Sequence, residues 1–180
     1  ASAFREYTSR ALGVKSSNIK LLLDHKANRP QILEALKIWL PKIARGGKKD
    51  IYIFFAGHGL ASFDGKDLFI LPHDGNSSLL SDTAITRNEI IKLIQNVEPK
   101  TVTMFFDTCY SGQTRDEQML VSDLRSIIIE ADKQDTPDNF TIFSASGSKQ
   151  VSGSIKEAKH GIFSYFLMKG LEGKADSNND

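Results

Sequence analysis

The sequence predicts one α/β domain in three layers, with a mostly parallel central sheet between helices, and three observations lead to this prediction. Short apolar segments of strand length alternate with segments of helical periodicity along the 180-residue chain. Two of the apolar segments, 51–56 and 101–106, are continuous runs, as in strands that are covered on both faces. The composition, with 40% hydrophobic and 25% charged residues, is that of a globular protein, and the length suits a single domain.

The first half of the chain contains strands and one long helix. The expected elements, in order, are a strand at 19–24, a helix over 31–47 and strands at 51–56 and 67–72. The helix has apolar residues at every third or fourth position, Pro30 suits its first turn, and two glycines at 46 and 47 end it. Pro41 is expected to kink this helix or to end it early. The strand at 67–72 is expected to form half of a hairpin at an edge.

The second half repeats this alternation. The expected elements, in order, are a helix over 88–97, a strand at 101–106, a polar segment at 113–139, a strand at 140–146 and a helix over 161–171. Thr86 and Glu89 match a capping box that opens the first of these helices, and Pro99 ends it. In parallel sheets ligands bind outside the carboxyl ends of the strands. This rule indicates the segments that follow the strands at 51–56 and 101–106.

Each of these two segments carries one residue that suits nucleophilic catalysis. His58 lies in "AGHG" and Cys109, the only cysteine, lies in "DTCYSG". Taken alone, Cys109 would be a buried structural residue and His58 a turn residue. If the two strands are neighbours, however, thiol and imidazole face one another, which is the pairing that thiolate attack on a carbonyl requires.

A phosphatase is a competing interpretation of the same cysteine. Cys109 and Arg115 have the Cys-x5-Arg spacing of cysteine-dependent phosphatases, in which the arginine grips a phosphate. Asp107 disfavours this hypothesis because its carboxylate would repel a phosphate dianion. The hypothesis also leaves His58 without a role.

The two motifs together resemble a known family. "FFAGHG" at 54–59, followed about fifty residues later by "FFDTCYSG" at 105–112, resembles the caspase-like cysteine peptidases, which include caspases, metacaspases and paracaspases. The Asp-x-Cys-x-Ser-Gly form is that of metacaspases, and bacterial caspase homologues of the orthocaspase type look most similar. The resemblance continues through 27–40, 68–75, 81–86 and 143–171. It implies a caspase-hemoglobinase fold and cysteine endopeptidase activity.

The resemblance also implies roles for individual residues. Cys109 matches the nucleophile, His58 the general acid and base, and the backbone N–H groups of Gly59 and Cys109 match the oxyanion hole. Asp107 matches the acid of the S1 pocket that selects Arg or Lys at P1, the residue before the scissile bond; the alternative for Asp107 is a capping role in the turn after Cys109. A strip that pairs with the substrate backbone matches Gln150, Val151 and Ser152.

The amino-terminal end of the chain departs from the family pattern. In the family a central strand that carries a second S1 acid precedes the first helix, whereas this chain begins inside that helix, at 4–12. Residues 1–180 are therefore expected to be one caspase-like domain and a fragment that lacks the first central strand. Upstream residues are expected to supply this strand, and other domains of the same protein are expected as partners.

The polar segment 113–139 suggests self-processing and a metal. Its basic residues Arg125, Arg115 and Lys133 are candidate self-cleavage sites, with Arg125 preferred. The resemblance implies no required cofactor, although calcium is an option because oxygen ligands are numerous: Asp116, Glu117, Asp123, Asp132, Asp135 and Asp138. Their spacing singles out no calcium loop.

Charge and hydropathy restrict the partners. The net charge of +1 indicates neither nucleic acid nor an anionic membrane as partner, and no apolar run is long enough to span a bilayer. The expected partners are peptide or protein substrates with Arg or Lys at P1. The chain opens without a signal peptide and has no second cysteine for a disulfide, so a cytoplasmic location is expected. A catalytically silent caspase-like interaction module is the alternative function.

Overall fold

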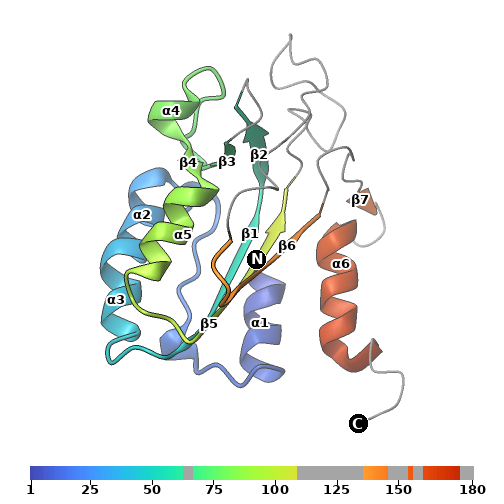
Figure 1. Cartoon of the computed structure of the whole chain (residues 1–180). Helices are drawn as coiled ribbons and strands as arrows, with labels where there is room; N and C mark the ends of the chain where they lie inside the picture. The colour runs from blue at the N-terminus through green and yellow to red at the C-terminus, as the bar shows by residue number, and fades with distance from the viewer. Residues whose placement is uncertain (63–66, 109–135, 146–153, 156–159, 175–180) are drawn as a thin grey trace.

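A three-stranded parallel sheet lies at the centre of the protein. The computed structural model describes residues 1–62, 67–108, 136–145, 154–155 and 160–174 (Figure 1). Within these residues the sheet has the order β1-β5-β6, from β1 (Asp50–Ala56), β5 (Thr101–Asp107) and β6 (Phe140–Ser144). Both strand pairs are parallel. The predicted α/β class and parallel sheet are therefore confirmed.

The hydrophobic core lies between one face of this sheet and three helical segments: α2 (Arg29–Glu34), α3 (Leu40–Ile43) and α5 (Arg87–Gln95). Alternate residues of β5 point to this face, because side chains along a strand alternate between its two sides. They are Val102, Met104 and Phe106, all less than 2% exposed. They pack with Ile51 of β1 and with apolar residues of the helices, among them Leu36, Leu40, Ile90, Ile91 and Ile94.

The helix predicted over 31–47 begins at Arg29 and continues to Ile43. The side chain of Asn28 caps it by accepting a hydrogen bond from the Gln31 N–H, with Pro30 in the first turn. Pro41 does not end the helix. A π-helical turn, Ala35–Trp39, comes just before Pro41, and a widened turn of this kind accommodates a residue that lacks an N–H. The two glycines that follow have φ values of 94° and 64°, which end the helix.

The helix start predicted at Thr86 is confirmed, with Thr86 as the N-cap of α5. The Thr86 Oγ1 accepts a hydrogen bond from the Glu89 N–H at 3.0 Å, which satisfies one of the unpaired donors of the first turn. The helix ends at Gln95, before Pro99, as expected. Strand β5 begins two residues after this proline.

The opposite face of the sheet is covered by α1 (Ser2–Arg10) and α6 (Ile162–Lys169), so that helices flank the sheet on both sides (Figure 1). Phe54, Phe105 and Phe143 are paired with one another across the three strands and form one aromatic row. Phe4 of α1 stacks on Phe54 with ring centroids 4.4 Å apart. Aromatic stacking therefore holds α1 against the sheet.

A second, antiparallel sheet has the order β2-β3-β4, from β2 (His58–Ala61), β3 (Leu68–Leu71) and β4 (Ile85–Thr86). Strands β2 and β3 form a hairpin, as predicted for the segment 67–72. The predicted edge position is wrong, because β3 also pairs with β4 and is the central strand of this sheet. The short helix α4 (Leu80–Thr83) precedes β4. Residues Ser154–Ile155 (β7) and His160–Gly161 (β8) pair as a further two-stranded antiparallel ribbon.

The strand predicted at 19–24 is wrong. Residues 19–23 have no regular structure and lie between two 3₁₀ turns, Ser16–Asn18 and Asp24–Lys26. The backbone is extended at Ile19 and Leu23, but the segment forms no ladder with any described strand. An apolar, extended segment becomes a strand only when a neighbouring strand accepts its hydrogen bonds. Strand β1, at the edge of its sheet, pairs with β5 alone among the described strands.

Candidate active site

The carboxyl ends of β1 and β5 lie side by side. The two strands pair in register through Ala56↔Asp107, and the Gly57 N–H extends the ladder by a bond of 3.3 Å to the Asp107 carbonyl oxygen. His58 comes two residues after Ala56, and Cys109 comes two residues after Asp107 in the sequence. Cys109 itself lies outside the described residues. The adjacency of the two strands, on which the predicted dyad depends, is observed.

The turn between β1 and β2 favours a glycine. A Cβ atom at Gly57 would lie 2.9 Å from Cζ of Phe55, which is closer than real Cβ atoms approach a neighbour. Phe55 packs against the core and cannot yield freely. The absence of a side chain at position 57 thus allows the chain to place His58 directly after the carboxyl end of β1.

His58 is the first residue of β2 and its side chain is exposed. It pairs with Leu71 of β3, so its backbone is held by the hairpin. An exposed imidazole at this edge can donate and accept hydrogen bonds. Its neighbour Gly59 is buried.

The backbone N–H of Gly59 points away from β3. Ser62, which continues the β2–β3 register, donates its N–H to the Asp67 carbonyl oxygen at 2.8 Å. Hydrogen-bonded pairs alternate along an antiparallel ladder, so His58 belongs to a hydrogen-bonded pair and Gly59 does not. In the described part of the sheet β2 is an edge strand, and the Gly59 N–H is therefore directed to its open side. A donor in this position suits an oxyanion hole.

Asp107 is buried at the end of β5, with 1% of its surface exposed. Its carboxylate Oδ2 accepts a hydrogen bond from the hydroxyl of Ser164, a residue of α6 that is itself 6% exposed. A carboxylate at the bottom of a specificity pocket would be buried in this way, and so would one with a capping role. Asp107 is therefore tied to the helix that covers it.

Ser164 was not predicted from the sequence as a site residue. Its signal was weak: a single serine within the apolar helix "IFSYFLM", four residues before the buried Met168 and thus on the same helix face. A polar side chain on a buried face needs a hydrogen-bonding partner. That requirement could have marked Ser164, but the sequence does not name the partner.

Several predicted site residues lie outside the described part of the chain. These are the substrate strip Gln150, Val151 and Ser152 and the self-cleavage candidates Arg115, Arg125 and Lys133. Of the six oxygen ligands considered for calcium, only Asp138 is described, and its side chain is exposed. The described residues contain no cluster of three or more His, Cys, Asp or Glu side chains that could hold a metal ion.

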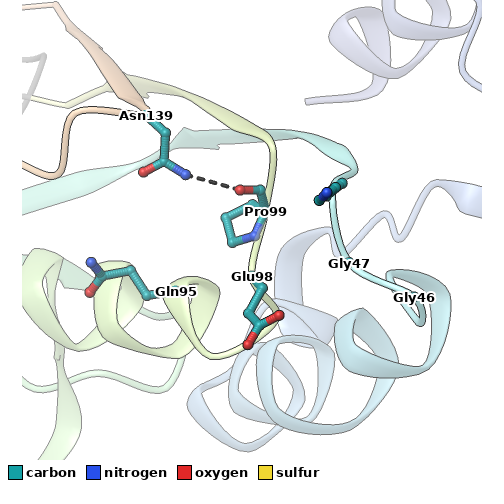
Figure 2. Close-up of a pocket in the computed structure, with 7 residues that line it drawn as sticks. Gly46, Gly47, Gln95, Glu98, Pro99 and Asn139 are labelled. Carbon is teal, nitrogen blue, oxygen red and sulfur yellow. Dashed lines mark hydrogen bonds between the residues drawn. The ribbon is translucent and has the colours of Figure 1, made fainter.

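A pocket of about 440 Å³ lies at the other end of the sheet, where the strands begin (Figure 2). The end of α5 and the loops before β1, β5 and β6 line it: Gly46, Gly47, Lys48, Gln95, Glu98, Pro99 and Asn139. Lys48 donates its N–H to the Glu98 carbonyl oxygen at 2.9 Å, and the Asn139 side chain donates to the Pro99 carbonyl oxygen at 3.0 Å. These bonds join the loops at the amino ends of the strands, so the pocket is separate from the candidate active site.

Neither a comparison with protein-family models nor a search of curated protein sequences found a match to this chain. None of the described helices has the length and apolar character needed to cross a membrane.

Proposed function

We propose that this protein is a caspase-like cysteine endopeptidase of the caspase-hemoglobinase fold that cleaves peptide bonds after Arg or Lys. The observation that carries the proposal is the parallel, in-register pairing of β1 with β5 up to Ala56↔Asp107. This pairing ends β1 and β5 at the same edge of one sheet, and in the sequence His58 and Cys109 each follow the last paired residue of these strands by two positions. The outward direction of the Gly59 N–H and the buried Asp107 two residues before Cys109 give further support.

The reaction assigns one task to each group. The thiolate of Cys109 attacks the scissile carbonyl carbon, and the electron pair that moves to the carbonyl oxygen is stabilised by the N–H groups of Gly59 and Cys109. When the C–N bond breaks, His58 gives the leaving amine the proton it took from the thiol. Water then attacks the thioester with His58 as base, which releases the carboxylic acid and restores the thiol. No metal or organic cofactor takes part in these steps.

The substrate is recognised through charge in this proposal. A carboxylate at position 107 attracts a guanidinium or ammonium group at P1 and repels an acidic side chain. The resemblance to metacaspases, carried by Asp107, Cys109 and the two residues Ser111-Gly112, points to the same preference.

Turnover of matched peptides with Arg, Lys or Asp at P1 tests the proposal. The wild type should cleave the first two, whereas Cys109→Ala and His58→Ala should each lose at least about 10³-fold in kcat because dyad residues act as a unit. His73→Ala is the matched control, since His73 is exposed in a turn after β3. Calcium should be varied in the same assay.

Other outcomes would contradict the proposal. Cleavage that survives Cys109→Ala would contradict the role of Cys109 as nucleophile. An absence of any cleavage together with no labelling by a P1-arginine activity probe would favour a silent interaction module. Hydrolysis of a phosphate ester that depends on Cys109 and Arg115, without peptide cleavage, would favour a phosphatase. Intact masses of wild type and Cys109→Ala show whether the enzyme processes itself at Arg125, and masses that differ only by the substitution would contradict self-processing.

A further inference from the structure

The side chain of Asp107 lies on the face of the sheet that α1 and α6 cover. Residues of β5 alternate between the two faces, and Val102, Met104 and Phe106 occupy the core on the other side. Asp107 therefore shares its face with Phe105, which contacts Phe4 of α1 at a centroid distance of 5.4 Å. The residue that reaches Asp107 from α6 is Ser164.

The bond from Ser164 to Asp107 holds one defined atom. The hydroxyl donates to Oδ2, both residues are almost fully buried, and the serine is fixed to a helix that packs on the sheet. A hydrogen bond to an ionised acceptor is stronger than a neutral one, and little water competes with it in a buried position. An aspartate side chain has two rotatable bonds, so a fixed partner for Oδ2 sets the plane of its carboxylate.

The orientation of that plane matters for one class of ligand. A guanidinium binds a carboxylate through two parallel N–H···O bonds and requires the two groups to be coplanar, whereas an ammonium is a point charge that tolerates many orientations. A carboxylate has lone pairs for about four hydrogen bonds, so the bond to Ser164 does not prevent Oδ2 from accepting another.

From this geometry we infer that Ser164 is a positioning residue that sets the preference of the P1 site for arginine over lysine. The inference rests on the proposed function, in which Asp107 binds the P1 side chain. Ser164 acts through the carboxylate of Asp107, to which its hydroxyl is bonded. Loss of the hydroxyl should therefore weaken the binding of arginine substrates more than that of lysine substrates.

Paired P1-Arg and P1-Lys peptides, identical elsewhere, test this inference. Ser164→Ala should lower kcat/KM for the arginine peptide about tenfold, mostly by raising KM, and should change the lysine peptide much less. Ser164→Thr and Ser164→Val form a pair of equal shape of which only the threonine keeps a hydroxyl, so the threonine variant alone should retain the wild-type ratio. Thr8→Ala is the control: Thr8 is also 6% exposed, but its hydroxyl bonds to the Phe4 carbonyl oxygen within α1.

A binding experiment tests this inference separately from the proposed catalysis. In Cys109→Ala protein, calorimetry would compare the binding of product peptides that end in Arg and in Lys, with Ser164 present and replaced by valine or threonine. A selective loss of arginine binding in the valine variant supports the inference even if the wild type cleaves no peptide. The absence of cleavage would contradict the proposed function but not this inference. Equal losses for both peptides, or unchanged binding in a folded valine variant, would overturn it.

Discussion

At the scale of single residues, the candidate site depends as much on backbone positions as on reactive side chains. Gly57 lets the chain turn where a Cβ would collide with Phe55, and Gly59 offers an N–H on the open side of β2. Asp107 is held in place by Ser164. The three positions lie near the edge at which β1 and β5 end, and none of them is the proposed nucleophile. Each can therefore be replaced while the thiol of Cys109 is kept.

Replacement of Asp107 should alter specificity without altering the thiol. Asp107→Ala should remove most cleavage after P1 arginine, at a cost of about 2–5 kcal/mol for loss of a desolvated charge pair, whereas the alkylation rate of Cys109 by iodoacetamide should change little. Peptide kinetics and thiol labelling of the same preparations measure the two effects. Asp107→Asn separates charge from hydrogen bonding. If Asp107 is a capping residue, Asp107→Asn should keep the activity that Asp107→Ala loses. The wild type should then also cleave P1-Asp and P1-Arg peptides at equal rates.

Replacement of Gly57 should strain the turn that carries His58. In Gly57→Ala the new methyl group would meet the Phe55 ring at 2.9 Å, and overpacking of this kind costs about 1–3 kcal/mol. Urea denaturation should show this loss of stability, and displacement of His58 should lower kcat in parallel. Phe55→Leu in the Gly57→Ala background should recover part of the loss, because it removes the ring that the methyl group meets. A double-mutant cycle in which the two substitutions add without interaction would refute the clash.

At the scale of elements, helix ends follow local chemistry, whereas helix packing follows contacts between distant segments. Asn28 and Thr86 cap α2 and α5 through their own side chains. The contact between α1 and the C-terminal turn Gly170–Lys174, in contrast, includes a hydrogen bond from the Tyr7 hydroxyl to the Glu172 carboxylate, and Lys169 forms an ion pair with Glu172 at 3.2 Å. The two helices on the outer face of the sheet are thus joined by side chains 165 residues apart.

The Tyr7–Glu172 bond should contribute to stability only within a pH window. The bond from Tyr7, followed by that from Lys169, lowers the pKa of Glu172 from its ordinary 4.5, so its contribution is present above pH 4.5 and is lost as the pH falls through the lowered pKa. The same bond raises the pKa of Tyr7 above its ordinary 10.0, so that contribution is present below pH 10.0 and is lost as the pH rises through the raised pKa. Between these limits Tyr7→Phe should lower Tm slightly, by less than about 4 °C, because both groups lie at the surface.

Thermal unfolding across pH 3 to 11 measures this difference. The control is Tyr165→Phe, which keeps the ring that Lys169 lies over at 5.9 Å from its centroid. This control should show no comparable window. A Tyr7→Phe difference that is constant with pH would indicate lost packing instead of a lost hydrogen bond.

At the scale of the whole molecule, β1 is an edge strand of the parallel sheet as far as the residues are described. In the described residues β5 is central, and β1 and β6 lie at the two edges. The Gly57 N–H and the Lys49 carbonyl oxygen both form hydrogen bonds on the β5 side. Because peptide groups alternate in direction along a strand, the odd-numbered residues between them, Ile51, Ile53 and Phe55, direct their N–H and C=O groups to β5. Tyr52 and Phe54 direct theirs to the outer side, where no described strand pairs with them and another strand can add.

Amide hydrogen exchange should therefore distinguish the two sides of β1. In the 180-residue chain the amides of Tyr52 and Phe54 should exchange at least about tenfold faster than those of Ile53 and Phe55, because only the latter are hydrogen-bonded to β5. If upstream residues supply a further strand, a chain extended at its amino end should slow the exchange of Tyr52 and Phe54 specifically. Equal exchange rates for both sets in the 180-residue chain would show that the outer edge is already paired.

The sequence by itself determined the elements whose signals are local. Strands β1 and β5, the cap at Thr86 and the start of the long helix near Pro30 follow from apolar runs, capping residues and proline geometry, all of which act within a few residues. The sequence also marked the ends of β1 and β5 as the candidate site, because the motifs with His58 and Cys109 directly follow these strands.

Only the tertiary structure decided what those elements contact. The run at 19–24 is apolar enough for a strand, yet among the described strands none pairs with it, and a ladder needs two members. Three further features were not predicted from local pattern alone. They are the neighbours of β5, the continuation of a helix through Pro41 after a π-helical turn, and the bond between Ser164 and Asp107. These features depend on groups that are distant in the chain or on how neighbouring turns adjust to packing. Hydrophobic periodicity shows which face of a segment is buried, but it does not show which partner buries that face.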